Sequence, residues 1–316
     1  MARWFSLLFF LAAGAAAQYP ERPLRFVVPQ APGSATDNVA RLLAPELARQ
    51  LGQPVVVDNR PGGALTIGID AIAKAPPDGY TIGMGPVGAL AITRHMVAKL
   101  PYDIERDLQP VALITTGYML LAVSPRLPVQ SVPELIDYAK KNPGKLSNAS
   151  SSNGSPGHVS GELFKYMTGT DIMHVPYKGG ASAIADLIAG NVQLMFESTN
   201  SIAPHVKAGR VRALAVTGAR RAASLPEVPT LDEAGVPGYE VTAWTGVIAP
   251  AGLARPVLER LNGAVNAAIA EPKVKERLGQ LGSEGGGGTP EDYAALIRRD
   301  SAKWGEVIRR SGAKIE

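Results

Sequence analysis

The chain alternates short apolar strand patterns with amphipathic helix patterns, and this alternation restarts past its middle. Residues 24–29 form an apolar run that ends in a Gly-containing loop, and Val39, Leu43 and Leu47 then recur at helical spacing. The same order of strand, polar turn and helix returns after Val123. Strands that alternate with helices predict parallel sheets covered by helices. We therefore expect two similar α/β halves with mainly parallel sheets, followed by a helical tail.

The individual elements follow from apolar runs, caps and breakers. The predicted strands are 24–29, 55–57, 80–84, 146–150, 174–177, 193–196, 211–216 and 240–248. Two helices are predicted to begin at the caps Thr36-Asp37 and Ser131-Val132-Pro133-Glu134. Further helices are predicted over about 66–74, 158–167, 255–270, 272–281 and 289–311, and two more begin near 182 and 201. Gly285 to Gly288 is expected to be a flexible connection.

The first residues predict export. Arg3 precedes an apolar run of roughly ten residues, which is too short to span a bilayer as a helix, and Ala15 to Ala17 offers an A-x-A cleavage site. Residues 1–17 are therefore interpreted as a signal peptide cleaved after Ala17, which places the mature chain in the periplasm. A short N-terminal membrane anchor is the alternative. The sequence has no cysteine, so disulfides, thiol catalysis and a lipid anchor on cysteine are excluded.

The charge distribution argues against nucleic acid as a partner. The formal net charge is +4, and the densest basic cluster, Arg298 to Arg310, lies on a helix pattern with interspersed acids. A basic stripe with interleaved aromatic residues is missing from the sequence. The rest of the chain also has no second long apolar segment, so we expect a protein that does not itself span the membrane.

Two polar loops follow the first strand of each half. Ligands of open parallel sheets bind beyond the carboxyl ends of strands, where helix N-termini offer free N–H groups to a carboxylate or phosphate. The first loop is Gly33-Ser34-Ala35-Thr36-Asp37, and the second is Ser150-Ser151-Ser152-Asn153-Gly154-Ser155 with His158 close behind. Each could be an ordinary capped turn, but equivalent positions in the two halves favour a shared binding role.

Further candidates are weaker. Glu197 and Ser198 follow an apolar strand, and they could either accept a hydrogen bond from a ligand or cap the next helix. Trp244 could either line a pocket or belong to the core. Gly83-x-Gly85-x-x-Gly88 formally matches a dinucleotide fingerprint, but it follows the third strand and contains Pro86. We expect no cofactor, and interpret Gly85 as allowing close approach of a ligand.

Catalytic and metal patterns are scarce. His95, His158, His174 and His205 do not pair at metal-ligand spacing, and the sequence has no G-x-S-x-G elbow. Ser155 and His158 could suggest a nucleophile and base, although both fit a helix cap more simply. The sequence therefore predicts no metal site and no catalytic residues.

With these residues in view, the chain resembles the Bug-type receptors of tripartite tricarboxylate transporters. The resemblance runs from about Tyr19 to Gly312. Its short segments follow the family's order: 19–20 leading into 24–29, Pro32-Gly33, 36–41, 51–62, 77–81, 100–103, His158 with 161–164, 174–179, 207–215 and 225–230.

The resemblance implies a hinged receptor of the type II periplasmic-binding-protein fold. Lobe 1 would comprise 18–120 plus 243–316, lobe 2 would comprise 121–242, and hinge strands near 115–125 and 238–246 would join them. The family generally holds a carboxylate between the lobes through backbone N–H groups and waters. Apart from the resemblance, Lys178 and Arg60 are the only Arg or Lys residues that we assign to the proposed loops, and Lys178 is a candidate ligand contact. Gln30, Ser34, Gly62-Gly63-Ala64-Leu65 and Glu197 depart from the family's usual residues, which leaves the ligand's identity open.

The predicted function is therefore capture of a small organic acid or amino acid, without chemistry, and its delivery to membrane transporter subunits by a monomer. Glu197 would disfavour a second carboxylate nearby. An exported α/β hydrolase with Ser155 and His158 in its active loop, and a ligand-sensing partner of a membrane signalling kinase, are the alternatives.

Overall fold

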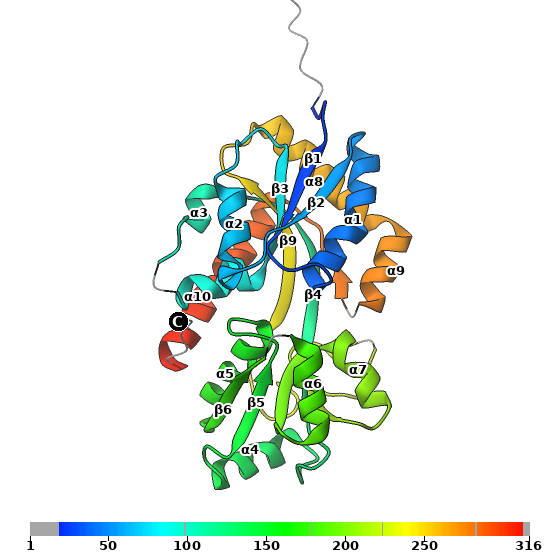
Figure 1. The fold of residues 1–316 in the computed structure, drawn as a ribbon. Helices are drawn as coiled ribbons and strands as arrows, with labels where there is room; N and C mark the ends of the chain where they lie inside the picture. Colours follow the sequence, from blue (N-terminus) through cyan, green and yellow to red (C-terminus); the bar gives the residue numbers. More distant parts are fainter. Residues whose placement is uncertain (1–18, 98, 178, 223, 282, 312–316) are drawn as a thin grey trace, which may run out of the picture.

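The protein is described by a computed structural model that covers residues 19–97, 99–177, 179–222, 224–281 and 283–311. The predicted signal peptide and Lys178 lie outside these residues. Figure 1 shows two lobes joined by the long strands β4 and β9. Among the described residues, no helix has both the length and the apolar character needed to cross a membrane.

Lobe 1 is built from both ends of the chain. Its elements are β1 (Leu24–Val28), α1 (Ala35–Leu51), β2 (Val55–Asn59), the short turn η1 (Gly63–Leu65), α2 (Thr66–Ala73), β3 (Thr81–Pro86), the turns η2 (Gly88–Ile92) and η3 (Thr93–His95), α3 (Ile104–Asp107), β9 (Thr242–Pro250), α8 (Arg255–Ala270), α9 (Pro272–Gln280), β10 (Ser283–Gly285) and α10 (Pro290–Ser311).

Lobe 2 is formed by the middle of the chain. The strand β4 (Leu108–Val123) begins in lobe 1 and continues into lobe 2. Its other elements are α4 (Val132–Lys141), β5 (Leu146–Ser150), α5 (Pro156–Thr168), β6 (Ile172–Pro176), α6 (Gly180–Ala189), β7 (Leu194–Ser198), α7 (Thr199–Lys207) and β8 (Arg212–Val216).

The sheets are mixed, which corrects the prediction of mainly parallel sheets. In lobe 1 the strand β1 pairs in parallel with β2 and β3, and in lobe 2 the strand β5 pairs in parallel with β6 and β7. The strand β9 instead runs antiparallel to β3 and β4, and β4 runs antiparallel to β7, β8 and β10. The reason is topological, because β4 carries the chain out of lobe 1 and β9 returns it beside β4.

The strand β4 belongs to both sheets. It pairs with β9 as far as Tyr118, opposite Thr242, and with β7 from Met119, opposite Ser198. This change of partner lies two residues before the predicted lobe limit at 120/121. The domain limits themselves stay a prediction, and the single unbroken strand explains why the sequence pattern around 115–125 has no turn signal.

Apolar residues cover both faces of each sheet. In β1, Phe26 and Val28 pack with α1 and α8 on one face, whereas Val27 packs with α2 and α10 on the other. This second core continues along β4 into lobe 2, where it includes Phe164 of α5. A third core lies between the lobe 2 sheet and the helices α6 and α7. Burial of this kind contributes roughly 25 cal/mol per Å² of apolar surface.

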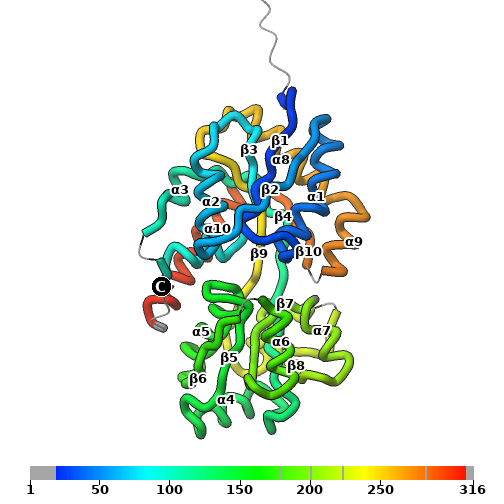
Figure 2. The backbone as a smooth tube through the Cα atoms, in the orientation of Figure 1, coloured from blue at the N-terminus to red at the C-terminus, as the bar shows by residue number. Residues whose placement is uncertain are grey.

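The helix α10 also reaches from lobe 1 to lobe 2. Figure 2 shows its C-terminal end beside α5. The Arg310 guanidinium lies 5.0 Å from the Tyr166 ring centroid and donates to the Tyr166 hydroxyl. The contact between Arg310 and Tyr166 therefore joins the lobes in addition to the two connecting strands.

The helix α10 begins with the predicted cap, in which Asp292 N–H donates to Thr289 Oγ1 and Thr289 N–H donates back to Asp292.

Two local predictions were wrong. The N-cap of α1 is Ser34 rather than Thr36 or Asp37, because Ser34 Oγ accepts from Asp37 N–H at 3.2 Å. The segment beginning at Gly285 is not a free connection, because the N–H groups of Gly286 and Gly287 donate to the Ile114 and Leu113 carbonyls of β4. Local composition indicated flexibility, but pairing with a distant strand decides the structure.

Candidate functional site

The first loop is held in place by Asp37. This carboxylate is 1% exposed and accepts hydrogen bonds from Gly33 N–H at 2.8 Å, Arg41 Nε at 2.9 Å and Asn59 Nδ2 at 2.9 Å. Burial alone would raise the pKa of Asp37, but the hydrogen bonds from Arg41, Gly33 and Asn59 outweigh it and hold that pKa below its usual value. Asp37 thus shapes the loop from beneath and is fully occupied within the protein.

The surface of the first loop is backbone and small side chains. Gly33 and Ala35 are exposed, Ser34 is half-buried and Thr36 is buried. Ala35 and Thr36 open helix α1, where the first N–H groups of a helix lack acceptors within the helix. Gly33 has a φ of 80°, a backbone conformation that favours glycine. The loop therefore presents N–H donors and the partial positive charge of a helix start.

The second loop is tied to helix α5 in a similar way. Ser155 is the N-cap, its hydroxyl accepts from His158 N–H at 3.3 Å, and Pro156 occupies the first turn. Gly154 N–H donates to His158 Nδ1 at 3.1 Å. Ser150, Ser155 and His158 are buried, whereas Ser152 and Asn153 are exposed. The buried members position the loop and the exposed ones remain accessible.

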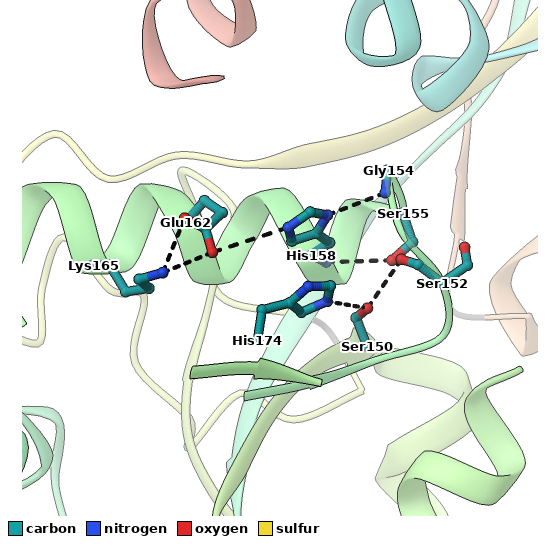
Figure 3. Close-up of polar contacts among 8 residues, drawn as sticks. All are labelled: Ser150, Ser152, Gly154, Ser155, His158, Glu162, Lys165 and His174. Carbon is teal, nitrogen blue, oxygen red and sulfur yellow. Dashed lines mark hydrogen bonds and ion pairs between the residues drawn. The ribbon is translucent and has the colours of Figure 1, made fainter. Parts of the chain in front are cut away.

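A pair of stacked histidines lies beneath the second loop (Figure 3). The His158 and His174 rings are parallel within 5° and their centroids are 3.7 Å apart. Burial, together with the neighbouring His174 and Lys165, lowers the pKa of His158 to about 3, and burial with Lys165 lowers that of His174 to about 4. Both rings are therefore neutral near pH 7, and they can stack without charge repulsion.

The hydrogen bonds fix the tautomer of each ring. His158 Nδ1 accepts from Gly154, so its proton is on Nε2. The single hydroxyl proton of Ser150 is directed to the Ser152 carbonyl at 3.0 Å, so His174 Nε2 donates to Ser150 Oγ at 2.7 Å. Neither histidine is placed as a base toward a serine, and Ser150 is 0% exposed. The Ser155 hydroxyl meets the backbone of His158 rather than its ring.

Glu197 lies at the end of β7, next to the second loop. Its carboxylate accepts from Ser198 N–H at 2.8 Å and Ser198 Oγ at 3.0 Å, and it is 8% exposed. Burial raises the pKa of Glu197 above its usual value, against the opposing effect of the two Ser198 hydrogen bonds. A Cβ on Gly180, the first residue of α6, would come within 2.8 Å of Glu197 Oε2. The neighbouring Gly179 N–H donates to the Ser151 carbonyl, which joins these segments into one surface.

The two lobes approach each other at Gly88 and Gly154. A Cβ built on Gly88 would lie 3.3 Å from Leu65 Cδ1 and 3.5 Å from the Gly154 carbonyl oxygen. A Cβ on Gly68 of α2 would lie 2.5 Å from Pro29 Cα, so the segment after β2 packs beside the end of β1. The loops after β1, β2 and β3 thus share one edge of lobe 1, and the second loop of lobe 2 faces this edge at Gly154.

Two predicted contacts belong to the interior instead. Tyr293 donates to the Gly85 carbonyl, and a Cβ on Gly85 would lie 2.7 Å from Leu90 Cδ1 and 2.9 Å from Ile248 Cγ2. Gly85 is therefore packed among core side chains, and Gly246, where a Cβ would lie 2.5 Å from the Tyr293 ring, makes room for that ring. Trp244 is 3% exposed, packs edge-on against Tyr293 and donates from Nε1 to Asp300 at 2.6 Å. Its indole is a core group of lobe 1 rather than a pocket wall.

Several residues near the site escaped the sequence analysis. Asn59 and Arg41 hold Asp37, His174 stacks on His158, and Leu65 contacts the lobe junction. In the sequence, Asn59 and Arg41 lie in segments that match the family, Leu65 belongs to a departure from it, and His174 begins a predicted strand. Pairing across distant strands brings them to the loops, and the sequence does not specify that register.

One surface hollow of lobe 1 lies apart from the two loops. A hollow of about 240 Å³ is lined by Glu240, Thr242, Arg299, Asp300, Lys303 and Trp304, none of which belongs to either loop. Across the residues that the structure describes, no group of three or more His, Asp or Glu side chains is arranged to hold a metal ion.

Two α/β lobes joined by long strands, with a loop at a helix start in each lobe, define the class of two-lobed solute-binding receptors. Residues 39–313 match the tripartite tricarboxylate transporter family receptor, and the chain belongs to this family. It is accordingly a solute-binding receptor and not an enzyme. The fold is the α/β type II periplasmic-binding-protein fold.

Solved structures agree over nearly the whole chain. Rpa4515 of R. palustris, solved with adipate, is 40% identical with a TM-score of 0.84, and the match covers 94% of this chain and 100% of that one. The periplasmic binding protein BugD is 36% identical with a TM-score of 0.82 and the same coverage. MatC of Rhodopseudomonas palustris, solved with bound malate, is 33% identical with a TM-score of 0.80, covering 92% and 100%.

Proposed function

We propose that the protein captures a small carboxylate between its lobes and delivers it to the membrane subunits of a tripartite transporter. The observation that carries this proposal is the placement of the two loops, each at the start of a helix and each braced by buried polar side chains. Relatives solved with adipate and malate support a carboxylate as the ligand. The finer contacts remain our proposal.

The loops supply donors without fixed cations. The starts of α1 and α5 direct N–H groups and partial positive charge toward an anion. Asp37 and His158 are occupied within the protein, so we expect them to position the loops. Ser34, Ala35, Ser151, Ser152 and Asn153 are the accessible residues that we expect to contact the ligand.

Closure about the connecting strands would complete the site. A ligand that contacts both lobes favours the closed arrangement, because its contacts with the second lobe exist only there. We infer that β4 near Tyr118 and the chain entering β9 near Thr242 absorb the motion, since these positions mark the change from one sheet to the other. The closed monomer would then dock on the transporter.

A thermal-shift screen of residues 18–316 against organic acids and acidic amino acids tests the proposal. A ligand at 100 times its Kd stabilises the folded state by roughly 2.7 kcal/mol. We expect a shift with at least one carboxylate and none with the corresponding amide. No shift with dicarboxylates, aliphatic or aromatic monocarboxylates or acidic amino acids would refute it. Export with cleavage after Ala17 is checked separately, by the N-terminal sequence of the periplasmic protein.

A further inference from the structure

The turn after β2 has four consecutive residues with positive φ, and only two of them are glycines. Gly62, Gly63, Ala64 and Leu65 all have positive φ, with values of 116°, 54°, 50° and 79°. Two consecutive glycines suit this conformation, but Ala64 and Leu65 carry side chains that disfavour it. Non-glycine residues in the left-handed region persist where the surroundings enforce them, and they concentrate at functional sites.

The surroundings of this turn are well defined. Leu65 N–H donates to the Gly62 carbonyl, and Thr93 Oγ1 donates to the Ala64 carbonyl at 3.3 Å. The Leu65 side chain is half-buried and packs against the core that includes Val87 and Leu90. Its Cδ1 atom borders Gly88, where lobe 1 meets Gly154 of the second loop. The strained residue therefore directs an isobutyl group to the junction of the lobes.

The turn that carries Leu65 is uncharged. The chain from Pro61 to Thr66 has no ionisable side chain. The preceding cation, Arg60, is half-exposed and its Nε donates to both carboxylate oxygens of Asp58, at 3.2 and 3.0 Å. A second carboxylate placed against Leu65 would therefore lose water without gaining a partner, which is costly for a charged group.

We propose that Leu65 is a specificity-determining residue, which makes the lobe 1 side of the ligand site apolar. This inference rests on the proposed function. The carboxylate of the ligand would face the helix-start loops, and an aliphatic or aromatic segment would contact Leu65. The site then favours monocarboxylates with an apolar body over short hydroxylated dicarboxylates.

Two substitutions of Leu65 distinguish the effect of its side chain from the effect of its backbone conformation. Leu65→Gly removes both the isobutyl group and the unfavourable conformation, whereas Leu65→Asn keeps a side chain that tolerates positive φ and makes it polar. Both variants are expected to fold, because each relieves the unfavourable conformation, and this relief offsets part of the apolar burial lost with the isobutyl group. Val56→Asn, at a 57% exposed apolar position of the same lobe, is the matched control.

Isothermal titration calorimetry with hexanoate and malate at pH 7.5 gives the readout. We expect the wild type to bind hexanoate more tightly than malate, and Leu65→Asn to reduce that preference about tenfold, in the range typical of changed apolar contacts. Val56→Asn should leave it unchanged. Tighter malate binding by the wild type, or a preference altered less than twofold in both Leu65 variants, overturns the role of Leu65 while leaving the receptor function intact. Failure of every carboxylate to bind the wild type overturns both proposals.

Discussion

His158 and His174 stack face to face with ring centroids 3.7 Å apart, and each ring supports the second loop at a different point. His158 accepts from the backbone of Gly154, and His174 donates to the hydroxyl of Ser150. The pair therefore fixes both ends of the segment that bears Ser151, Ser152 and Asn153. Protonation would place charge on the stacked rings, and at His158 Nδ1 it would remove the acceptor of the Gly154 N–H, so the conformation of the loop is linked to pH.

We predict that the free energy of unfolding decreases as pH falls from about 6.5 to about 4. The folded-state pKa values of His158 and His174, about 3 and about 4, lie below the unfolded value of about 6.5, so the unfolded chain binds more protons in this range. Each histidine then lowers the free energy of unfolding by up to about 1.4 kcal/mol for each unit by which the pH falls. Denaturant unfolding at several pH values measures the slope.

Single His158→Gln and His174→Gln variants provide the comparison. Each should be less stable at pH 7.5 but should show a shallower slope between pH 6.5 and 4.5. Glu197 acts in the opposite sense, because burial raises its pKa and its protonation then favours the folded state. A slope in both variants equal to that of the wild type would contradict a role for the stacked pair.

Ser155→Ala is predicted to weaken binding moderately and to lower the stability by about 1 kcal/mol, because it removes the N-cap of α5. Ser131→Ala removes the equivalent cap of α4, a helix that contributes no residue to either loop, and is the matched control. Both should lose similar stability in denaturant unfolding, while only Ser155→Ala changes the Kd. A hydrolytic activity that disappears with Ser155 would instead support the enzyme hypothesis.

Asp37→Asn is predicted to lower the stability by about 2 kcal/mol, since hydrogen bonds to a buried charge are stronger than those to a neutral amide. The first loop should loosen, because Gly33 N–H loses its carboxylate acceptor. Asp107→Asn is the control: its carboxylate accepts from Asp103 N–H and Arg106 in another part of lobe 1. Calorimetry should show weaker carboxylate binding for Asp37→Asn alone. Unaltered affinity would show that the loop keeps its shape without Asp37.

The sequence predicted what depends on local pattern. The strand Leu146–Ser150 and the caps at Ser131 and Thr289 lie where the spacing of apolar and capping residues placed them. Both loops also follow their predicted strands. Local pattern is informative here because a cap or an amphipathic face requires only a few neighbouring residues.

Long-range pairing was not predictable in this way. The long strand β4 contains no turn signal where it passes between lobes, so its shared role became visible only through its partners. Trp244 and Gly85 were offered as ligand contacts because they follow or lie in strands, but Tyr293, more than forty residues away in the chain, occupies their surroundings. The His158–His174 stack likewise depends on the register of β5 and β6.

Glu197→Gln is predicted to strengthen the binding of malate about fivefold at pH 7.5 while leaving hexanoate little changed. A buried carboxylate repels a second charge on the ligand, and the amide removes that repulsion without changing the shape of the side chain. Because burial raises the pKa of Glu197, malate should also bind the wild type more tightly as pH falls toward that pKa, and the variant should lack this trend. Glu134→Gln, a conservative change at the cap of α4, controls for altered charge in lobe 2. Calorimetric titrations between pH 5.5 and 8 follow both effects, and parallel pH profiles for wild type and Glu197→Gln would place Glu197 outside the reach of the ligand.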